Sequence, residues 1–166
     1  MGIGFARTGR RSGAGVMHTT QAGAGAAILI QIAVTFLWLG MVLAISFMEA
    51  PLKFRAPGVT VPIGLGIGRL VFRALNGVEA ALALLLGVIW VLSWPQYNGS
   101  FFVMGAVVCL LLQVVAVRPA LTRRSDAVLA GEDSPRSRAH HVYVLLELLK
   151  VAALASGGVL LLVSLG

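Results

Sequence analysis

Three ionisable residues interrupt long apolar stretches of this chain. Glu79, Glu147 and Lys150 lie in segments that are otherwise almost entirely apolar. Inside a bilayer such groups are costly, and they are usually paired with one another or functional. Because Glu147 and Lys150 are three residues apart, they share a helical face and can neutralise each other. Two interpretations follow: an ion, proton or anionic-substrate site, or a structural ion pair that only fixes the helix register.

Further polar residues share helical faces with these three groups. At about 100° per residue, Asn76 stands roughly 60° from Glu79, and His140 lies within roughly 80° of Lys150. Lipid cannot satisfy polar side chains, so such faces point into the bundle or line a water-filled cavity. We therefore predict a polar core near the cytoplasmic half of the membrane. Its members are Glu49, Arg69, Arg73, Asn76, Glu79, His140, Tyr143, Glu147 and Lys150.

The first and third apolar segments also contain polar residues. Gln31, Thr35, Trp38 and Glu49 fall within roughly 60° of one another on a helix and form one stripe. Gln113 is the only polar interior residue of the third segment. These residues are expected to face the interior for the same reason.

The composition places the chain among integral membrane proteins. Apolar residues make up 58% and charged residues 11%, with a mean hydropathy of +0.94, whereas roughly a quarter of residues are charged in soluble domains. About 20 apolar residues cross a bilayer, so 166 residues accommodate one bundle and no second domain. The sequence pI of about 11.1 comes without a nucleic-acid recognition motif, so we predict no nucleic-acid partner.

Four apolar segments are long enough to cross the membrane. Pro51 follows the first, a turn with Pro95 follows the second, and Arg118-Pro119 follows the third. Thr60-Val61-Pro62 is typical of a helix start with a hydroxyl cap. The predicted fold class is all-α, a four-transmembrane-helix bundle. Its membrane domain covers residues 24–166, with spans at about 24–47, 62 or 74–94, 100–117 and 139–165.

The basic residues indicate how the bundle is oriented. After Arg11, all ten lysines and arginines fall within residues 53–73 and 118–150, which follow the first and third segments. Positive residues concentrate in cytoplasmic loops. We therefore predict a multi-pass protein of the cell inner (plasma) membrane with both termini on the non-cytoplasmic side. Residues 1–23 are predicted to be a disordered tail, with Met17 as an alternative start.

The remaining motifs predict no cofactor and no metal. The run Gly64-Leu65-Gly66-Ile67-Gly68-Arg69 fits neither the dinucleotide fingerprint nor the P-loop. Gly64 and Gly68, four residues apart, are better suited to close helix packing. His140 and His141 point about 100° apart on a helix, so they do not easily face one metal together.

Residues 46–58, with the sequence Ser-Phe-Met-Glu-Ala-Pro-Leu-Lys-Phe-Arg-Ala-Pro-Gly, resemble a run in small bacterial four-helix membrane proteins of unknown function. More distantly, three features are similar to a eukaryotic transmembrane protein linked to platinum-drug resistance: the aromatic and proline end of the first span, Arg118-Pro119, and the histidine that enters the fourth span. The resemblance covers about Phe47 to Lys150. It implies a four-helix bundle without an established reaction.

The primary functional interpretation is a small polytopic membrane protein with a charged intramembrane core, related to transport or to channels. One alternative is a structural or accessory subunit of a larger membrane complex, in which the polar core only locks the helices. A second alternative is a membrane enzyme for a lipid or quinone, with His140 and Glu147 as acid and base. The expected partners are membrane lipids and a second copy of the chain or a larger membrane complex.

Overall fold

The secondary structure is entirely helical within residues 12–93, 96–130 and 138–166, which the computed structural model describes. Within these residues, four helices are long and apolar enough to cross a membrane. They are Gly25–Arg55, Val61–Leu92, Asn98–Ala127 and Arg138–Val163. The all-α class with four such helices is therefore confirmed, and the four candidate spans indicate a multi-pass membrane protein.

The first span consists of four consecutive helical elements: α1 (Ser12–Val42), the π-helical η1 (Leu43–Glu49), α2 (Ala50–Leu52) and the 3-10 turn η2 (Lys53–Arg55). The backbone N–H of Ala50 donates to the carbonyl of Ile45, which is the five-residue spacing of a π-helix. Pro51 has no N–H, and its ring crowds the carbonyl four residues earlier. We infer that the wider π-helical turn accommodates Pro51, so that the helix continues beyond the predicted span 24–47.

The first helix also begins earlier than the predicted span. α1 starts at Ser12, so it occupies the second half of the stretch 1–23 that the sequence analysis treats as a tail. No proline lies between Ser12 and Ala50 to end the helix. Residues 1–11, which include the three arginines of the N-terminus, lie outside the described residues.

The third span repeats the arrangement of the first. It consists of α4 (Asn98–Leu112), the π-helical η3 (Gln113–Val117) and α5 (Arg118–Leu129). The backbone N–H of Arg118 donates to the carbonyl of Gln113, and Pro119 stands two residues after the π segment, as Pro51 does. The prediction that the helix stops before Arg118-Pro119 is wrong, because the π-helical turn lets the chain pass the proline without breaking.

The second and fourth spans are single helices, α3 (Val61–Leu92) and α6 (Arg138–Val163). A turn with Gly58 at φ +79° leads into α3, a conformation that favours glycine. Thr60 precedes the helix in an extended conformation, as predicted, but its hydroxyl makes no cap hydrogen bond. Its carbonyl accepts from the N–H of Gly64 at 2.9 Å, which is the first bond of the helix.

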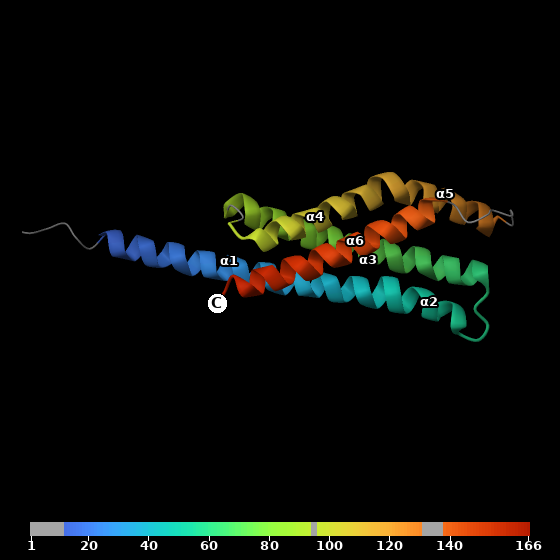
Figure 1. Cartoon of the computed structure of the whole chain (residues 1–166). Helices are drawn as coiled ribbons and strands as arrows, with labels where there is room; N and C mark the ends of the chain where they lie inside the picture. Colours follow the sequence, from blue (N-terminus) through green and yellow to red (C-terminus); the bar gives the residue numbers. More distant parts are fainter. Residues whose placement is uncertain (1–11, 94–95, 131–137) are drawn as a thin grey trace, which may run out of the picture.

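The helices lie side by side, with α6 between α4 and α1 in the bundle (Figure 1). The Gly58 turn, the end of α5 and the start of α6 lie at one end, called here the basic end (Figure 1). The end of α3, the start of α4 and the C-terminus lie at the other end, called the apolar end. The described start of α1 points in the same direction as the apolar end (Figure 1).

The closest helix contact joins α4 and α6 at the apolar end. A Cβ atom added to Gly99 would lie 2.6 Å from the carbonyl oxygen of Gly157, and one added to Gly157 would lie 2.9 Å from that of Gly99. Neither position can therefore hold a side chain without a shift of the backbone. Small residues that allow two backbones to approach are typical of helix pairs in membranes.

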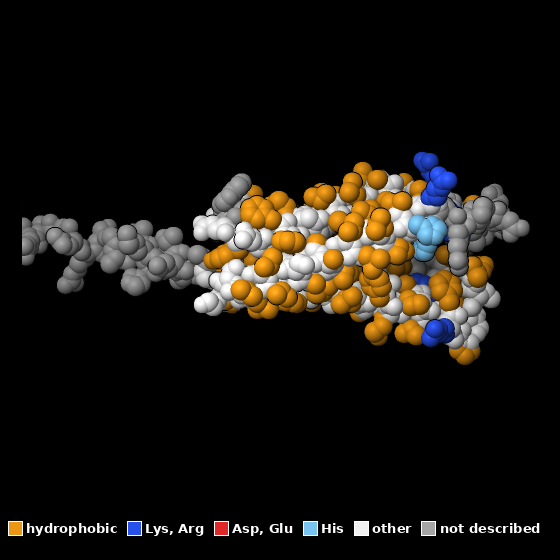
Figure 2. All heavy atoms as spheres, viewed as in Figure 1, with side chains coloured by type: hydrophobic (Ala, Val, Ile, Leu, Met, Phe, Trp, Pro, Cys, Tyr) orange, Lys and Arg blue, Asp and Glu red, His pale blue; other side chains and the backbone are white. Residues whose placement is uncertain are grey.

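The surface is apolar along the length of the bundle and basic at one end. Leucine and valine side chains point outward from every span, for example Leu84 and Val91, which are 70% and 86% exposed. Figure 2 shows hydrophobic side chains over the middle of the visible face, whereas the lysine, arginine and histidine side chains gather at the basic end. Lipid is the environment that such an exposed apolar band fits.

Candidate functional site

The described part of the chain contains a buried ion-pair cluster at the centre of the bundle. Nζ of Lys150 lies 2.5 Å from Oε1 of Glu79 and 3.1 Å from Oε2 of Glu147. The side chains of Lys150 and Glu79 have no exposed surface, and that of Glu147 is 3% exposed. We call these three residues the triad. Lys150 and Glu147 come from α6 and Glu79 from α3, so the triad joins two spans.

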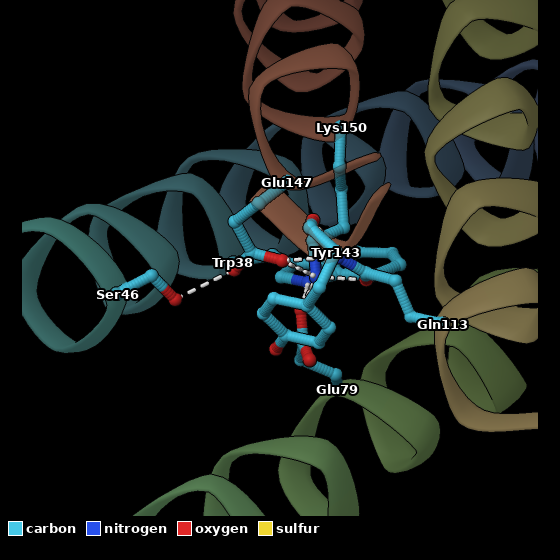
Figure 3. A network of polar contacts seen from close by, with 7 residues as sticks. All are labelled: Trp38, Ser46, Glu79, Gln113, Tyr143, Glu147 and Lys150. Carbon is cyan, nitrogen blue, oxygen red and sulfur yellow. Dashed lines mark hydrogen bonds and ion pairs between the residues drawn. The ribbon is translucent and has the colours of Figure 1, made fainter. Parts of the chain in front are cut away.

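Neutral side chains from the first and third spans complete the network around the triad (Figure 3). Nε1 of Trp38 donates to Oε1 of Glu79 at 2.8 Å, and Oγ of Ser46 donates to Oε1 of Glu147 at 2.6 Å. Nε2 of Gln113 donates to Oε2 of Glu147, and Oε1 of Gln113 accepts from Nζ of Lys150 at 2.9 Å. All four spans therefore supply a polar group to one buried site.

Both π-helical segments contribute to this network. Ser46 lies within η1, and Gln113 is the first residue of η3. A π-helical turn inserts an extra residue and changes the direction in which the following side chains point. Each π segment thus presents one hydrogen-bonding residue to the same carboxylate, that of Glu147. Such segments are frequent at functional sites in membrane and soluble proteins.

Three buried polar atoms at or near the triad have no hydrogen-bond partner: Oε2 of Glu79, Oδ1 of Asn76 and the hydroxyl of Tyr143. Glu79 is fully buried, and Asn76 is 7% exposed. Tyr143 points into the network between Glu147 and Glu79 (Figure 3), and its backbone carbonyl accepts from Nε2 of Gln113 at 3.5 Å. Buried polar atoms without a partner are rare in folded proteins and require an explanation.

The charges of the triad do not balance. Two carboxylates and one ammonium sum to −1 when all three are ionised. The neutral donors Trp38, Ser46 and Gln113 stabilise the carboxylates but supply no positive charge. An uncompensated buried charge costs several kcal/mol even after the protein relaxes. One further positive charge at the site would remove this imbalance.

The nine residues predicted as a polar core do not form a single cluster. Glu79, Glu147 and Lys150 meet in the triad, and Asn76 and Tyr143 carry the unpartnered atoms described above. The other four are placed differently. Glu49 pairs with Lys53 at 3.4 Å, Arg69 pairs with Asp126 at 2.6 Å, and Arg73 and His140 are exposed at the basic end. The functional role of the nine residues stays a prediction.

Two of these last four residues, Arg69 and Glu49, form ion pairs that the sequence did not predict. The sequence predicts a connection over residues 118–138 that is helical in part between Ala120 and Ala130. The structure has a continuous helix there, α5, which brings Asp126 to Arg69. Glu49 is bound by Lys53 one turn later, because residues four apart lie on one face. Lys53 itself lies against α3, with Nζ 5.4 Å from the ring centre of Phe72.

The glycines at the start of α3 receive the end of the first span. A Cβ atom added to Gly68 would lie 2.9 Å from Nζ of Lys53, and one added to Gly64 would overlap the ring of Phe54. Gly64 and Gly68 were predicted to allow close packing between helices. In the structure they instead make room for two side chains of η2, those of Phe54 and Lys53, because neither glycine has a Cβ atom.

Ser46 is not among the site residues predicted from the sequence. On a regular helix, Ser46 points about 80° away from Trp38 and so leaves the polar stripe. The π-helical segment η1 changes this direction, and hydropathy does not reveal it. The sequence does indicate that Gln113 and Trp38 face the interior, because each has a hydrogen-bonding side chain in the middle of an apolar helix.

A second polar cluster lies on the apolar-end side of the triad. Oε1 of Gln31 accepts from Nε1 of Trp90 at 3.0 Å and from Oγ of Ser100 at 2.9 Å. Oγ of Thr35 donates to the backbone carbonyl of Gln31 at 2.7 Å. These contacts join the first, second and third spans and satisfy the side-chain oxygen of Gln31. The predicted stripe of the first span therefore has partners both here and at the triad.

The polar contacts of the first span extend over most of a membrane thickness. From Gln31 to Glu49 there are 18 residues, which correspond to about 27 Å of helix, close to the roughly 30 Å of a hydrocarbon core. Between these ends lie Trp38 and Ser46, both bonded to the triad. One helix thus carries polar contacts from the apolar end to the basic end.

Comparison with known proteins gives no family. The chain matches no protein-family model, no curated protein and no solved structure. Only the general feature of the predicted resemblance is supported, which is four long apolar helices. Among the described residues, no group of three or more His, Cys, Asp or Glu side chains is placed to hold a metal ion.

Proposed function

We propose that this chain is a membrane protein of the transport or channel type, in which the triad takes up and releases one positive charge. The observation that carries the proposal is the imbalance of two buried carboxylates against one lysine. A structural lock needs one acid and one base, and a second buried carboxylate adds a desolvation cost of several kcal/mol. A site that exchanges a cation accounts for the second carboxylate.

The depth of the triad also supports this proposal. Lys150 lies midway along α6, and Glu79 is separated from the exposed residue Arg73 by six residues, or about 9 Å of helix. Transport proteins place ion and substrate sites near the middle of the bilayer, where helices depart from regular geometry. The π segments η1 and η3 are such departures, and both contact the triad.

An accessory role in a larger membrane complex is the second candidate. It is favoured by the closed form of the network, in which each charged group of the triad contacts another and all four spans are joined. Such a network fixes the relative positions of the helices. In that role the protein would lose stability, or a co-purifying partner, when the network is removed.

Proton flux in liposomes separates the two roles. The purified protein is reconstituted into liposomes that contain a pH-sensitive dye, and a potential is imposed with potassium and valinomycin. Glu79→Gln and Glu147→Gln each remove one acid and leave the remaining pair neutral. The transport role predicts that both variants stay folded and lose the flux. Glu49→Gln is the matched control, because Glu49 lies outside the network and pairs with Lys53. Wild-type protein without flux, together with loss of a bound partner in either variant, would support the accessory role.

The orientation and the partners are part of the same proposal. The basic end, with its arginines, lysine and histidines, faces the cytoplasm. Both termini then lie outside an inner (plasma) membrane, at the apolar end. The apolar outer faces bind lipid, and a second copy of the chain joins the first, because four helices enclose little room for a substrate path.

A further inference from the structure

We infer that the positive charge taken up by the triad is a proton, and that Oε2 of Glu79 holds it. This inference rests on the proposed function and names the ion and the atom. With the proton bound, neutral Glu79 accepts from Lys150, and the ammonium of Lys150 is balanced by the carboxylate of Glu147. When the proton leaves, the buried site has a net charge of −1.

The two carboxyl groups have different surroundings. Both oxygens of Glu147 are used: Oε1 accepts from Ser46, Oε2 accepts from Gln113, and Nζ of Lys150 lies 3.1 Å from Oε2. Glu79 accepts from Trp38 and Lys150 on Oε1 only, and its Oε2 is buried without a partner. Hydrogen bonds to a carboxylate stabilise its charged form. Glu147 is therefore the carboxyl group that stays ionised, and Glu79 is the one that is protonated.

An acceptor for the proton of Glu79 lies on its own helix. Asn76 stands three residues before Glu79 on α3, a spacing at which two side chains meet. Its Oδ1 is buried and has no donor. An O–H group at Oε2 of Glu79 supplies the donor that Oδ1 of Asn76 lacks. One proton thus accounts for two otherwise unexplained atoms, Oε2 of Glu79 and Oδ1 of Asn76.

A proton fits this position better than a metal cation does. Nζ of Lys150 is only 2.5 Å from the other oxygen of the same carboxyl group. A metal ion bound at Oε2 would keep its charge and be repelled by the ammonium at short range. A proton becomes part of a neutral carboxyl group and leaves no charge beside Lys150.

The charged groups around Glu79 decide the net charge of the whole site. α6 contributes the charged Lys150 and Glu147 and the phenol of Tyr143. The first and third spans contribute the neutral side chains of Trp38, Ser46 and Gln113 to the network, among the residues that the structure describes. Because two acids face one lysine, a single bound proton makes the net charge of the triad zero.

Infrared spectroscopy of the purified protein in lipid tests the inference directly. A protonated carboxylic acid has a carbonyl band that an ionised carboxylate lacks, and the band shifts in D2O. Labelling glutamate with ¹³C assigns the band to a glutamate, and the chain has only six acidic residues in all. We expect one buried, protonated glutamate in the wild-type protein at neutral pH.

Variants of the neighbours locate the proton. Asn76→Ala removes an acceptor beside Glu79, so it should shift the band, whereas Ser46→Ala removes a donor to Glu147 and should leave the band in place. Glu79→Gln and Glu147→Gln should both abolish the band, because either change leaves one acid for one lysine. Circular dichroism and a monodisperse elution profile show that each variant is folded.

Three results would overturn the inference. They are a wild-type protein without the band, a band that shifts in Ser46→Ala but not in Asn76→Ala, and a band that persists in Glu147→Gln. If the band instead disappears only when sodium is added, the site binds a metal cation and the inference fails. The proposed transport role is tested separately. If the band behaves as expected but the protein conducts no protons, the proton site is supported and the transport role is wrong.

Discussion

Lys150 and Glu79 form an ion pair of 2.5 Å in which neither side chain has any exposed surface. This pair joins α6 to α3, a helix that packs less extensively against the bundle than α4 and α6 pack against each other. The second polar contact of Glu79 is with Trp38 of α1. Glu79 therefore links α3 to both α6 and α1.

Replacing the lysine should weaken the bundle more than replacing either acid. Lys150→Met removes the only positive charge of the triad, and leaving a buried carboxylate without its partner costs about 3 to 5 kcal/mol. Glu79→Gln or Glu147→Gln leaves one acid with one base and should cost much less. Thermal unfolding in detergent, followed by circular dichroism, measures the difference.

A triple variant and a second lysine, Lys53, provide the controls for this prediction. Lys150→Met combined with Glu79→Gln and Glu147→Gln carries no charge in the triad, so it should recover most of the stability lost in Lys150→Met. Lys53→Met removes an ion pair whose acid is 30% exposed, and such pairs contribute about 0 to 1 kcal/mol. If Lys53→Met and Lys150→Met lower the unfolding free energy equally, the triad does not contribute more to stability than the Lys53–Glu49 pair.

The cluster around Gln31 should couple three spans energetically. Gln31→Leu leaves the N–H of Trp90 and the hydroxyl of Ser100 without their acceptor inside the membrane. Interhelical hydrogen bonds in membrane proteins are worth about 0.6 kcal/mol on average and up to about 1.7 kcal/mol. A double-mutant cycle of Gln31→Leu with Ser100→Ala should give a coupling energy in this range. Thr122, which is exposed on α5, is the control site, and Thr122→Val should show no coupling with Gln31→Leu.

Two glycines of the third and fourth spans should respond to alanine with opposite signs. A Cβ atom at Gly157 meets the carbonyl of Gly99 and the side chain of Val103 at 2.9 and 2.8 Å. Gly157→Ala should therefore destabilise the α4–α6 contact, by about 1 to 3 kcal/mol. Gly105→Ala meets no atom within 4 Å, and alanine is about 0.5 to 1 kcal/mol better than glycine inside a helix. If both variants gain stability, the close approach of α4 and α6 is not maintained in lipid.

The four spans could be predicted from the sequence because bilayer thickness fixes the length of an apolar helix. Their ends could not be predicted as well. Prolines usually end helices, yet the chain passes Pro51 and Pro119 by means of the π segments η1 and η3. Neither hydropathy nor residue type distinguishes a π turn from a helix end at these prolines. The extension of α5 to Leu129 is the largest consequence.

The candidate site could be predicted in part for a similar reason. The cost of burying a charge in lipid was sufficient to identify Glu79, Glu147 and Lys150 as interior residues. Which charges meet depends on how the helices pack, and sequence periodicity gives only the face of each helix. Arg69 binds Asp126 because α5 extends beyond the apolar segment. Because periodicity does not give the positions of the helices relative to one another, the predicted polar core combined residues that lie apart in the structure.

Single cysteines should report the orientation of the bundle. Cys109 is the only native cysteine, so Cys109→Ser gives a background in which Gln96→Cys and Thr122→Cys can be labelled individually. Both positions are exposed, Gln96 at the apolar end and Thr122 on α5 toward the basic end. Because basic residues favour the cytoplasmic side, an impermeant maleimide should label Gln96→Cys in intact cells. It should label Thr122→Cys only after the cells are permeabilised. The reverse labelling pattern would place the basic end outside the cell and both termini in the cytoplasm. The orientation predicted from the basic residues would then be wrong.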